Sequence, residues 1–233
     1  MPSDFPNRPR FLKGALVVYE SQDAGGPPPK VVGFQFNPDT VKRTLERRAV
    51  EQKGGGGGGT PNKEDLMRAQ GPPTESIVMT VTINASEQLE SPDENRTAVE
   101  SGIYPVLSML EMLLYPSSAK VEEVKNLASA GEVQISPADL PFVLLVWGES
   151  RVVPVLITGF TINETGFDVK LNPLAATVEL NMKVLTYLEL KSGSVGRDAY
   201  LAYQQHKERH AQALQPARDE QTIRDLVAGA RPR

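Results

Sequence analysis

FVLLVWGESRVVPVLITGFTINETGFDVKLNPLAATVELNMKVLTYLEL, residues 142–190, is the stretch that decides the fold. It contains strand-like runs at 142–148, 151–162 and 166–169, and residues 171–176 lead into a fourth. Short apolar runs separated by turn-forming residues are typical of an antiparallel sheet. The stretch holds no group that is clearly able to make or break a bond, so it favours a scaffold or assembly role over an enzyme.

The fourth run gives the clearest periodicity. Its apolar residues share one parity: Ala176, Val178, Leu180, Met182, Val184 and Leu188. Its polar residues share the other: Thr177, Glu179, Asn181 and Lys183. This alternation predicts a strand with one buried and one wet face.

Further strands are expected before this stretch. Residues 15–20 and 31–36 predict a hairpin, and 41–50 favours an edge strand whose charges discourage stray pairing. Residues 76–86 predict a strong strand, with Ile77, Met79, Val81, Ile83 and Ala85 on one face. Together with the later strands they predict a domain over residues 14–190.

A glycine-rich insertion interrupts this domain at residues 51–75. Six consecutive glycines at 54–59 cannot hold a regular element, because each loses too much backbone freedom on ordering. Thr60 and Pro61 follow the run where a phosphate-binding loop needs Lys and Ser or Thr before a helix. We expect a mobile loop and no nucleotide site.

One long helix is expected over residues 91–115. Ser91 can cap it, Pro92 suits its first position, and Glu94 completes a capping box. Apolar residues recur there at helical spacing, which predicts one buried stripe. Pro105 should kink the helix or divide it near Gly102.

The two ends of the chain differ in character. Residues 1–13 are rich in proline and charge and predict a loose arm. Residues 191–233 predict a helical extension, with a hinge at 192–196, a long helix over 197–214 and a last turn or two beyond Pro216.

Composition and charge limit the classes of function that are open to the protein. The net charge of −4 gives no general reason to bind nucleic acid, and the absence of cysteine excludes disulfides, thiolate catalysis and cysteine metal sites. No apolar run has the length of a signal peptide's core at the start or approaches the roughly 20 residues of a membrane span. We therefore expect a cytoplasmic protein with no membrane insertion of its own.

Four candidate groups have an ordinary structural interpretation. His206 and His210 lie four apart, but no third ligand is identifiable, so a solvated helix face is favoured over zinc. The carboxylates at the expected helix start suit the helix dipole better than acid–base chemistry; they are Glu87, Glu90, Asp93 and Glu94. Trp147 is expected to be half-buried at a strand end rather than a binding hot spot. The three Asn-x-Ser/Thr matches, at Asn84, Asn95 and Asn163, are chance without a secretory signal. We expect no catalytic, cofactor-binding or metal-binding residue.

The order of several segments resembles a known family. The segments are VGFQFNPDTVKR (32–43), GPPTESI (71–77), YPVLSMLEMLLYP (104–116), LPFVLLVWG (140–148), VPVLITGFTINETGFD (153–168) and LNPLAATVEL (171–180). In order and spacing they resemble the tube-protein family of contractile injection systems over roughly residues 11–190. Each motif is weak alone, and the shared order carries the resemblance.

The resemblance implies a mainly β, α+β, phage-tail-tube-like fold: an antiparallel β-barrel or sandwich with one packed helix, here followed by a C-terminal helical tail. It implies a structural baseplate adaptor, or tube initiator, that forms rings with copies of itself, commonly six-fold. The implied partners are the inner-tube protein, the spike or hub, and other baseplate or sheath subunits. Many of the longer members carry a C-terminal peptidoglycan-binding LysM module, which residues 191–233 do not resemble.

Two other classes stay open. A β-barrel module that binds a small molecule or glycan would show ligand-dependent thermal stabilisation. A hydrolase with an unrecognised site has the least support, because no nucleophile–base pair stands out.

Overall fold

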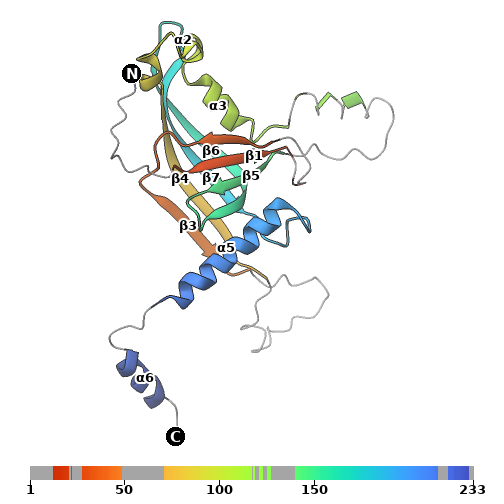
Figure 1. The fold of residues 1–233 in the computed structure, drawn as a ribbon, viewed down its shortest axis with the longest axis vertical. Helices are drawn as coiled ribbons and strands as arrows, with labels where there is room; N and C mark the ends of the chain where they lie inside the picture. Colours follow the sequence, from red (N-terminus) through yellow and green to blue (C-terminus); the bar gives the residue numbers. More distant parts are fainter. Residues whose placement is uncertain are drawn as a thin grey trace, which may run out of the picture.

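The computed structural model (Figure 1) describes residues 13–20, 28–48, 71–116, 140–214 and 220–230, with residues 22, 118, 121, 122, 125 and 126. Its centre is a seven-stranded antiparallel sheet in the order β2-β1-β5-β6-β7-β4-β3. The strands are β1 Ala15–Tyr19, β2 Lys30–Gly33, β3 Val41–Glu46, β4 Thr74–Asn84, β5 Phe142–Val146, β6 Val152–Phe167 and β7 Pro173–Val184. The helices are α1 Ser86–Leu89, α2 Arg96–Ser101, α3 Tyr104–Glu111, α5 Val195–Gln212 and α6 Glu220–Gly229.

The alternating strands bury the faces that the sequence predicts. On β4 the residues Ile77, Met79, Val81 and Ile83 are buried, and Ala85 follows them into the core. On β7 the five residues from Ala176 to Val184 of the apolar parity are buried too. Leu188 was expected on that face, but it lies beyond the end of β7 and is 53% exposed. The strand ends because the chain turns at Thr186, whose N–H and hydroxyl donate to Glu189.

The predicted hairpin and edge strand are present. β1 pairs with β2, and β3 pairs on one side with β4 at the edge of the sheet. The second strand is shorter than predicted and ends at Gly33, although the N–H of Phe34 still donates to the Gly14 carbonyl in the register of the hairpin.

The prediction of a separate strand-like run at 166–169 is wrong. β6 is one strand of 16 residues that continues to Phe167, and it pairs with β7 almost to its end. Gly166 stays within the strand at φ 63° instead of breaking it. The reversal follows at Asp168, whose carboxylate accepts the N–H groups of Lys170 and Asn172.

The sheet is strongly curved, but it is not the closed barrel that was expected. Its edge strands β2 and β3 are consecutive in the chain, and residues 34–40 connect them. The curvature brings the end of β2 near the far end of β4, since the Gln35 side chain exchanges two hydrogen bonds with the backbone of Asn84. The mainly β, α+β fold class that was predicted is confirmed. The predicted closure into a barrel is not, because within the described residues the two edge strands do not pair.

The predicted long helix is divided at Gly102, near which Pro105 was expected to kink or divide it. Gly102 adopts φ 58°, and a Cβ at this position would lie 2.2 Å from the carbonyl oxygen of Pro173. The capping prediction is wrong: α2 begins at Arg96, and Ser91 lies in the preceding turn, where its carbonyl accepts the N–H groups of Glu94 and Asn95. α3 packs Leu107 and Leu110 into the core of the sheet.

The two C-terminal helices behave differently. α5 packs on its own sheet through Tyr200 and Tyr203, and its Gly196 lies so near Phe142 that a Cβ would be 2.5 Å from the ring. Residues 221–228 of α6 are all exposed, and Figure 1 shows this helix at the end of the molecule away from the sheet.

Some expectations fall outside the described residues. The arm at 1–13, apart from Lys13, and the glycine run at 54–59 both lie there; β4 already begins at Thr74, inside the range predicted as insertion. Among the helices that are described, none combines the length and the apolar character needed to cross a membrane.

Candidate functional site

A long stretch of β6 has a strand on only one side. β5 pairs with β6 at Val152–Val155 only, whereas β7 accompanies β6 up to Phe167. Among the described residues, the twelve from Leu156 to Phe167 therefore have no strand on the β5 side. At about 3.3 Å per residue this edge is about 40 Å long. An unpaired row of backbone N–H and C=O groups of this length is a template for another strand.

The opposite side of the same ribbon is also open. β3 covers β4 only as far as Met79, so in the described structure Thr80–Ile83 have no strand beyond them. The end of this edge is held by a side chain: the Gln35 amide donates to the Asn84 carbonyl (2.9 Å), and its oxygen accepts the Asn84 N–H (2.8 Å). The distal halves of β6, β7 and β4 thus form a three-stranded ribbon with one long and one short open edge.

One face of this ribbon is polar and nearly free of large side chains. The strand register places Thr80, Glu179 and Thr161 in one row across the ribbon. It places Thr82, Thr177 and Asn163 in the next. All but Glu179 are uncharged, and all six are exposed. We call these six residues the polar face; such a surface stays hydrated and makes no strong ionic contact.

The other face of the ribbon is covered by its own chain. Val81, Ile83 and Val178 are at most 8% exposed and belong to the core on which α3 packs. The ribbon is therefore a rigid layer, with helices on one side and solvent on the other.

A buried carboxylate fastens α5 to the start of β4. The Glu75 side chain is 4% exposed and meets three groups: Arg43 Nε at 2.7 Å, the Tyr203 hydroxyl at 2.9 Å and Lys207 Nζ at 3.0 Å. The Tyr203 hydroxyl also accepts from Arg43 Nη2, and Lys207 Nζ lies 3.9 Å from the Tyr203 ring centroid. We call this set the Glu75 cluster.

The electrostatics of the Glu75 cluster favour its charged form. Burial raises the pKa of Glu75, but the hydrogen bonds and positive charges of Arg43 and Lys207 outweigh it, so this pKa lies below its ordinary value. Burial, together with the negative charge of Glu75, raises the pKa of Tyr203, so this hydroxyl stays protonated and donates. The cluster is an ion-paired network, and Glu75, Tyr203 and Lys207 also line an open pocket of about 550 Å³ between the start of β4 and α5.

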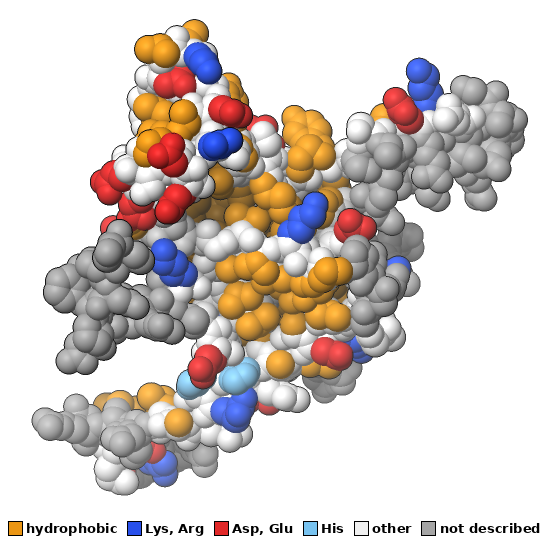
Figure 2. Space-filling model, turned by 45° about the horizontal axis from the view of Figure 1, so that its top comes forward, with side chains coloured by type: hydrophobic (Ala, Val, Ile, Leu, Met, Phe, Trp, Pro, Cys, Tyr) orange, Lys and Arg blue, Asp and Glu red, His pale blue; other side chains and the backbone are white. Residues whose placement is uncertain are grey.

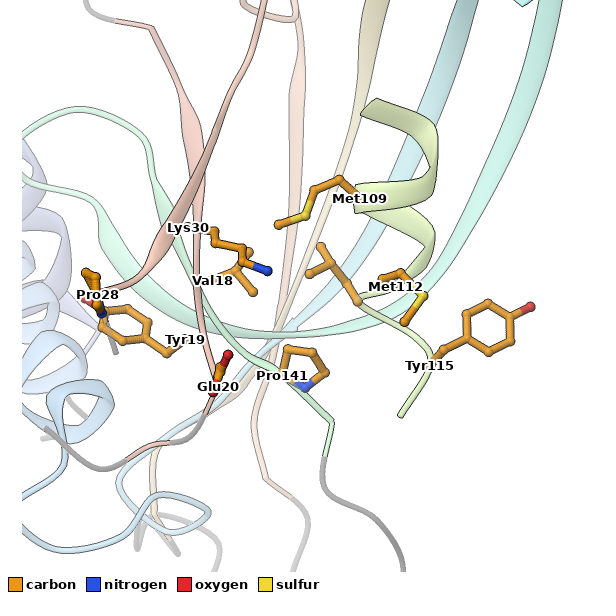
Figure 3. Close-up of a pocket in the computed structure, with 10 residues that line it drawn as sticks. Val18, Tyr19, Glu20, Pro28, Lys30, Met109, Met112, Tyr115 and Pro141 are labelled. Atoms are coloured by element: carbon orange, nitrogen blue, oxygen red, sulfur yellow. The ribbon is translucent and has the colours of Figure 1, made fainter. Parts of the chain in front are cut away.

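An apolar groove of about 350 Å³ lies between the β1–β2 hairpin and the C-terminal end of α3. Its floor and walls include Val18, Met109, Met112 and Leu113, and Glu20 and Lys30 also line it. Figure 2 shows hydrophobic side chains gathered over the middle of one face of the molecule. In Figure 3 the side chains of Met109 and Lys30 extend toward each other, whereas Tyr115 points away.

The residues that the sequence marked for chemistry are not brought together. His206 and His210 lie on the outer side of α5, and Arg209 contacts His206. In the described part of the chain no three His, Asp or Glu residues are grouped to hold a metal ion. The carboxylates Glu87, Glu90, Asp93 and Glu94 are exposed on and after α1.

The other two expectations concern Trp147 and the Asn-x-Ser/Thr matches. Trp147 is half-buried at the end of β5 against Phe34, as predicted. Asn84 caps a turn, accepting from the N–H and hydroxyl of Ser86.

Sequence reasoning missed the open edges and the Glu75 cluster. The edges follow from unequal strand lengths, since a 16-residue strand beside a 5-residue strand must overhang it. A signal for the cluster was present: Glu75 has the parity of Ile77 and Met79, so it had to point into the core.

Comparison with models of known protein families and with curated proteins found no match to this chain.

Proposed function

We propose that the protein is a non-enzymatic structural subunit that forms rings with copies of itself, as a baseplate adaptor or tube initiator of a contractile, phage-tail-like injection particle. The single observation that carries the proposal is the open edge of β6 at Leu156–Phe167 beside a polar face. The resemblance in the order of segments over residues 11–190 supplies the particle type.

The mechanism is assembly through strand edges. The ribbon of each copy has a long edge at β6 and a shorter one at β4, on opposite sides. When the β6 edge of one copy meets the β4 edge of the next, the contact is head-to-tail, and such contacts close into a ring if the rotation allows. The polar faces then form one continuous hydrated surface, as the wall of a channel requires.

The partners in this proposal are copies of the chain, the inner tube, the spike or hub, and neighbouring baseplate or sheath subunits. α6 supports a contact with such a neighbour. Its apolar residues Ile223, Leu226 and Val227 are 54–69% exposed, and a ten-residue helix is marginal in water without packing.

A ligand-binding barrel has less support. The sheet is not closed, and its concave side is filled by side chains such as Leu16, Leu145 and Leu180, each 0% exposed. The groove beside α3 lies at the edge of this core and not inside it.

The test compares two pairs of lysines on the same ribbon. Thr161→Lys with Asn163→Lys places charge on β6, at the open edge, where lysine blocks strand addition. Thr177→Lys with Asn181→Lys places the same charge on β7, which has strands on both sides. Sedimentation velocity and negative-stain microscopy should show rings for the wild type and the β7 variant, and at least tenfold weaker association for the β6 variant.

A wild-type protein that remains monomeric at all concentrations, alone and in particles isolated from producing cells, would rule out the proposal. Equal association of the two variants would exclude the β6 edge as the contact.

A further inference from the structure

The turn between β6 and β7 presents three apolar side chains to solvent. Phe167 is 51% exposed, Val169 101% and Leu171 75%. One exposed apolar side chain is ordinary, but three within five residues at the end of a projecting hairpin form a patch. We call these three residues the hairpin tip.

The hairpin tip is held rigidly. Asp168 Oδ1 accepts the N–H groups of Lys170 (2.7 Å) and Asn172 (2.8 Å), and Asp168 N–H donates to the Asn172 carbonyl (3.0 Å). The Asn172 side chain donates to Asp168 Oδ2 and to the carbonyl of Glu100 on α2. Because the turn is already ordered, docking it costs little conformational entropy.

Leu171 has an unfavourable backbone conformation. It is the one non-glycine residue with positive φ in the described chain, at 64°. Glycine or asparagine adopts this conformation at lower cost. A leucine kept in a conformation that suits glycine, with its side chain in solvent, indicates that the side chain is used for a contact.

The groove beside α3 complements the hairpin tip in its apolar lining and in its charges. Met109, Met112 and Leu113 give it an apolar lining, and methionine side chains adapt to an inserted shape. Its charged residues are Glu20 and Lys30. The tip carries the complementary pair, Lys170 and Asp168, on either side of Val169.

We propose that the hairpin tip of one copy docks in the groove of a second copy of this chain, with Lys170 facing Glu20 and Asp168 facing Lys30. The tip cannot enter its own groove, because Asn172 fixes it to α2 whereas the groove lies at the far end of α3. Figure 1 shows the β6–β7 turn at one end of the long axis, beyond α2. A copy that receives the tip is therefore displaced along this axis.

This contact rests on the proposed function and extends it: edge pairing closes a ring, and the tip joins one ring to the next layer. The two contacts use different residues, so each can fail alone. A convex patch and a concave patch on one chain make a head-to-tail contact, which repeats from layer to layer.

The first test uses cross-linking, for which the absence of cysteine gives a clean background. A Val169→Cys variant is mixed with a Met112→Cys variant under mild oxidation. We expect a disulfide between the two chains, and none when Val169→Cys is mixed with Leu201→Cys, a control on the exposed side of α5. Rings that form without a cross-link between positions 169 and 112 overturn this inference and leave the proposed function standing. If neither rings nor cross-links form, both this inference and the proposed function are overturned.

The second test is a charge exchange. Lys170→Glu and Glu20→Lys should each weaken layer stacking, measured by sedimentation, by at least threefold, and the double variant should recover it. Additive losses in the double variant overturn the pairing.

The third test separates stability from association. Leu171→Asn should melt at the same or a higher temperature, since strain is relieved, yet stack at least tenfold more weakly. A lower melting temperature with unchanged stacking shows that Leu171 serves its own fold and overturns the inference.

Discussion

Glu75 Oε1 accepts a 2.9 Å hydrogen bond from the Tyr203 hydroxyl, 128 residues further along the chain. The contact joins the first residues of β4 to the middle of α5, and it makes α5 part of the sheet domain. Arg43 on the edge strand β3 meets both groups, so three elements depend on one carboxylate.

Replacing Glu75 by alanine should destabilise the fold. Arg43 and Lys207 would lose their shared acceptor, and Tyr203 would keep a buried hydroxyl without one of its partners. We expect a loss of about 2–3 kcal/mol in the free energy of unfolding, measured by urea denaturation. Glu179→Ala, an exposed carboxylate on β7, is the control and should change this free energy by less than about 0.5 kcal/mol. Equal losses in both variants would show that the cluster does not hold α5.

The free energy of unfolding should fall in mild acid because of Glu75. The folded-state pKa of Glu75 lies below its ordinary value of 4.5, so the folded protein binds this proton less readily than the unfolded chain. The resulting stability is fully present above that value and is lost as the pH falls through the folded-state pKa. Urea titrations between about pH 6 and pH 3 should show a smaller loss for Glu75→Gln than for the wild type. Glu189, whose pKa is also lowered, remains in both proteins and accounts for part of the slope that persists.

Gly102→Ala should be severely destabilising. The added Cβ would collide with the Pro173 carbonyl oxygen, and alanine disfavours φ 58°. We expect a loss of about 3 kcal/mol or more, or failure to fold, seen as a lower thermal midpoint. Gly159→Ala on β6 is the matched control, because a Cβ there has nothing within 4 Å and φ is ordinary. Its midpoint should stay near the wild-type value.

Charged substitutions on α6 should leave the fold unchanged. Ile223→Asp with Leu226→Asp removes two apolar side chains that are 54% and 69% exposed. We expect a change below about 0.5 kcal/mol in the free energy of unfolding, together with weaker capture of this chain by particles that lack it. A marked loss of stability would show that α6 packs on the sheet domain of its own chain. Unchanged capture would remove α6 from the proposed contact with a neighbour.

Strand faces could be predicted from the sequence because burial repeats every two residues. Ile77, Met79 and Val178 were placed correctly on this basis alone. Helix division was predictable at Gly102, since glycine followed closely by Pro105 interrupts the hydrogen-bond ladder. These are local properties, which depend on residues a few positions apart.

Properties set by distant residues could not be predicted in the same way. The capping pattern at Ser91 was present, but the turn through Asn95 placed the helix start four residues later, at Arg96 instead of Pro92. A separate run was predicted at 166–169, but pairing with β7 keeps β6 continuous to Phe167. The open edge of β6 and the partners of Glu75 depend on which strands and helices meet, and period-two alternation carries no information on this.

The Glu75 cluster also has a consequence for synthesis. Tyr203 and Lys207 lie 128 and 132 residues after Glu75, so they leave the ribosome long after β3 and β4 have emerged. Until then the nascent sheet holds a carboxylate that only Arg43 can neutralise, and contacts of such long sequence separation form slowly. The sheet domain therefore completes its packing only once α5 has been synthesised, which delays recognition between copies until then.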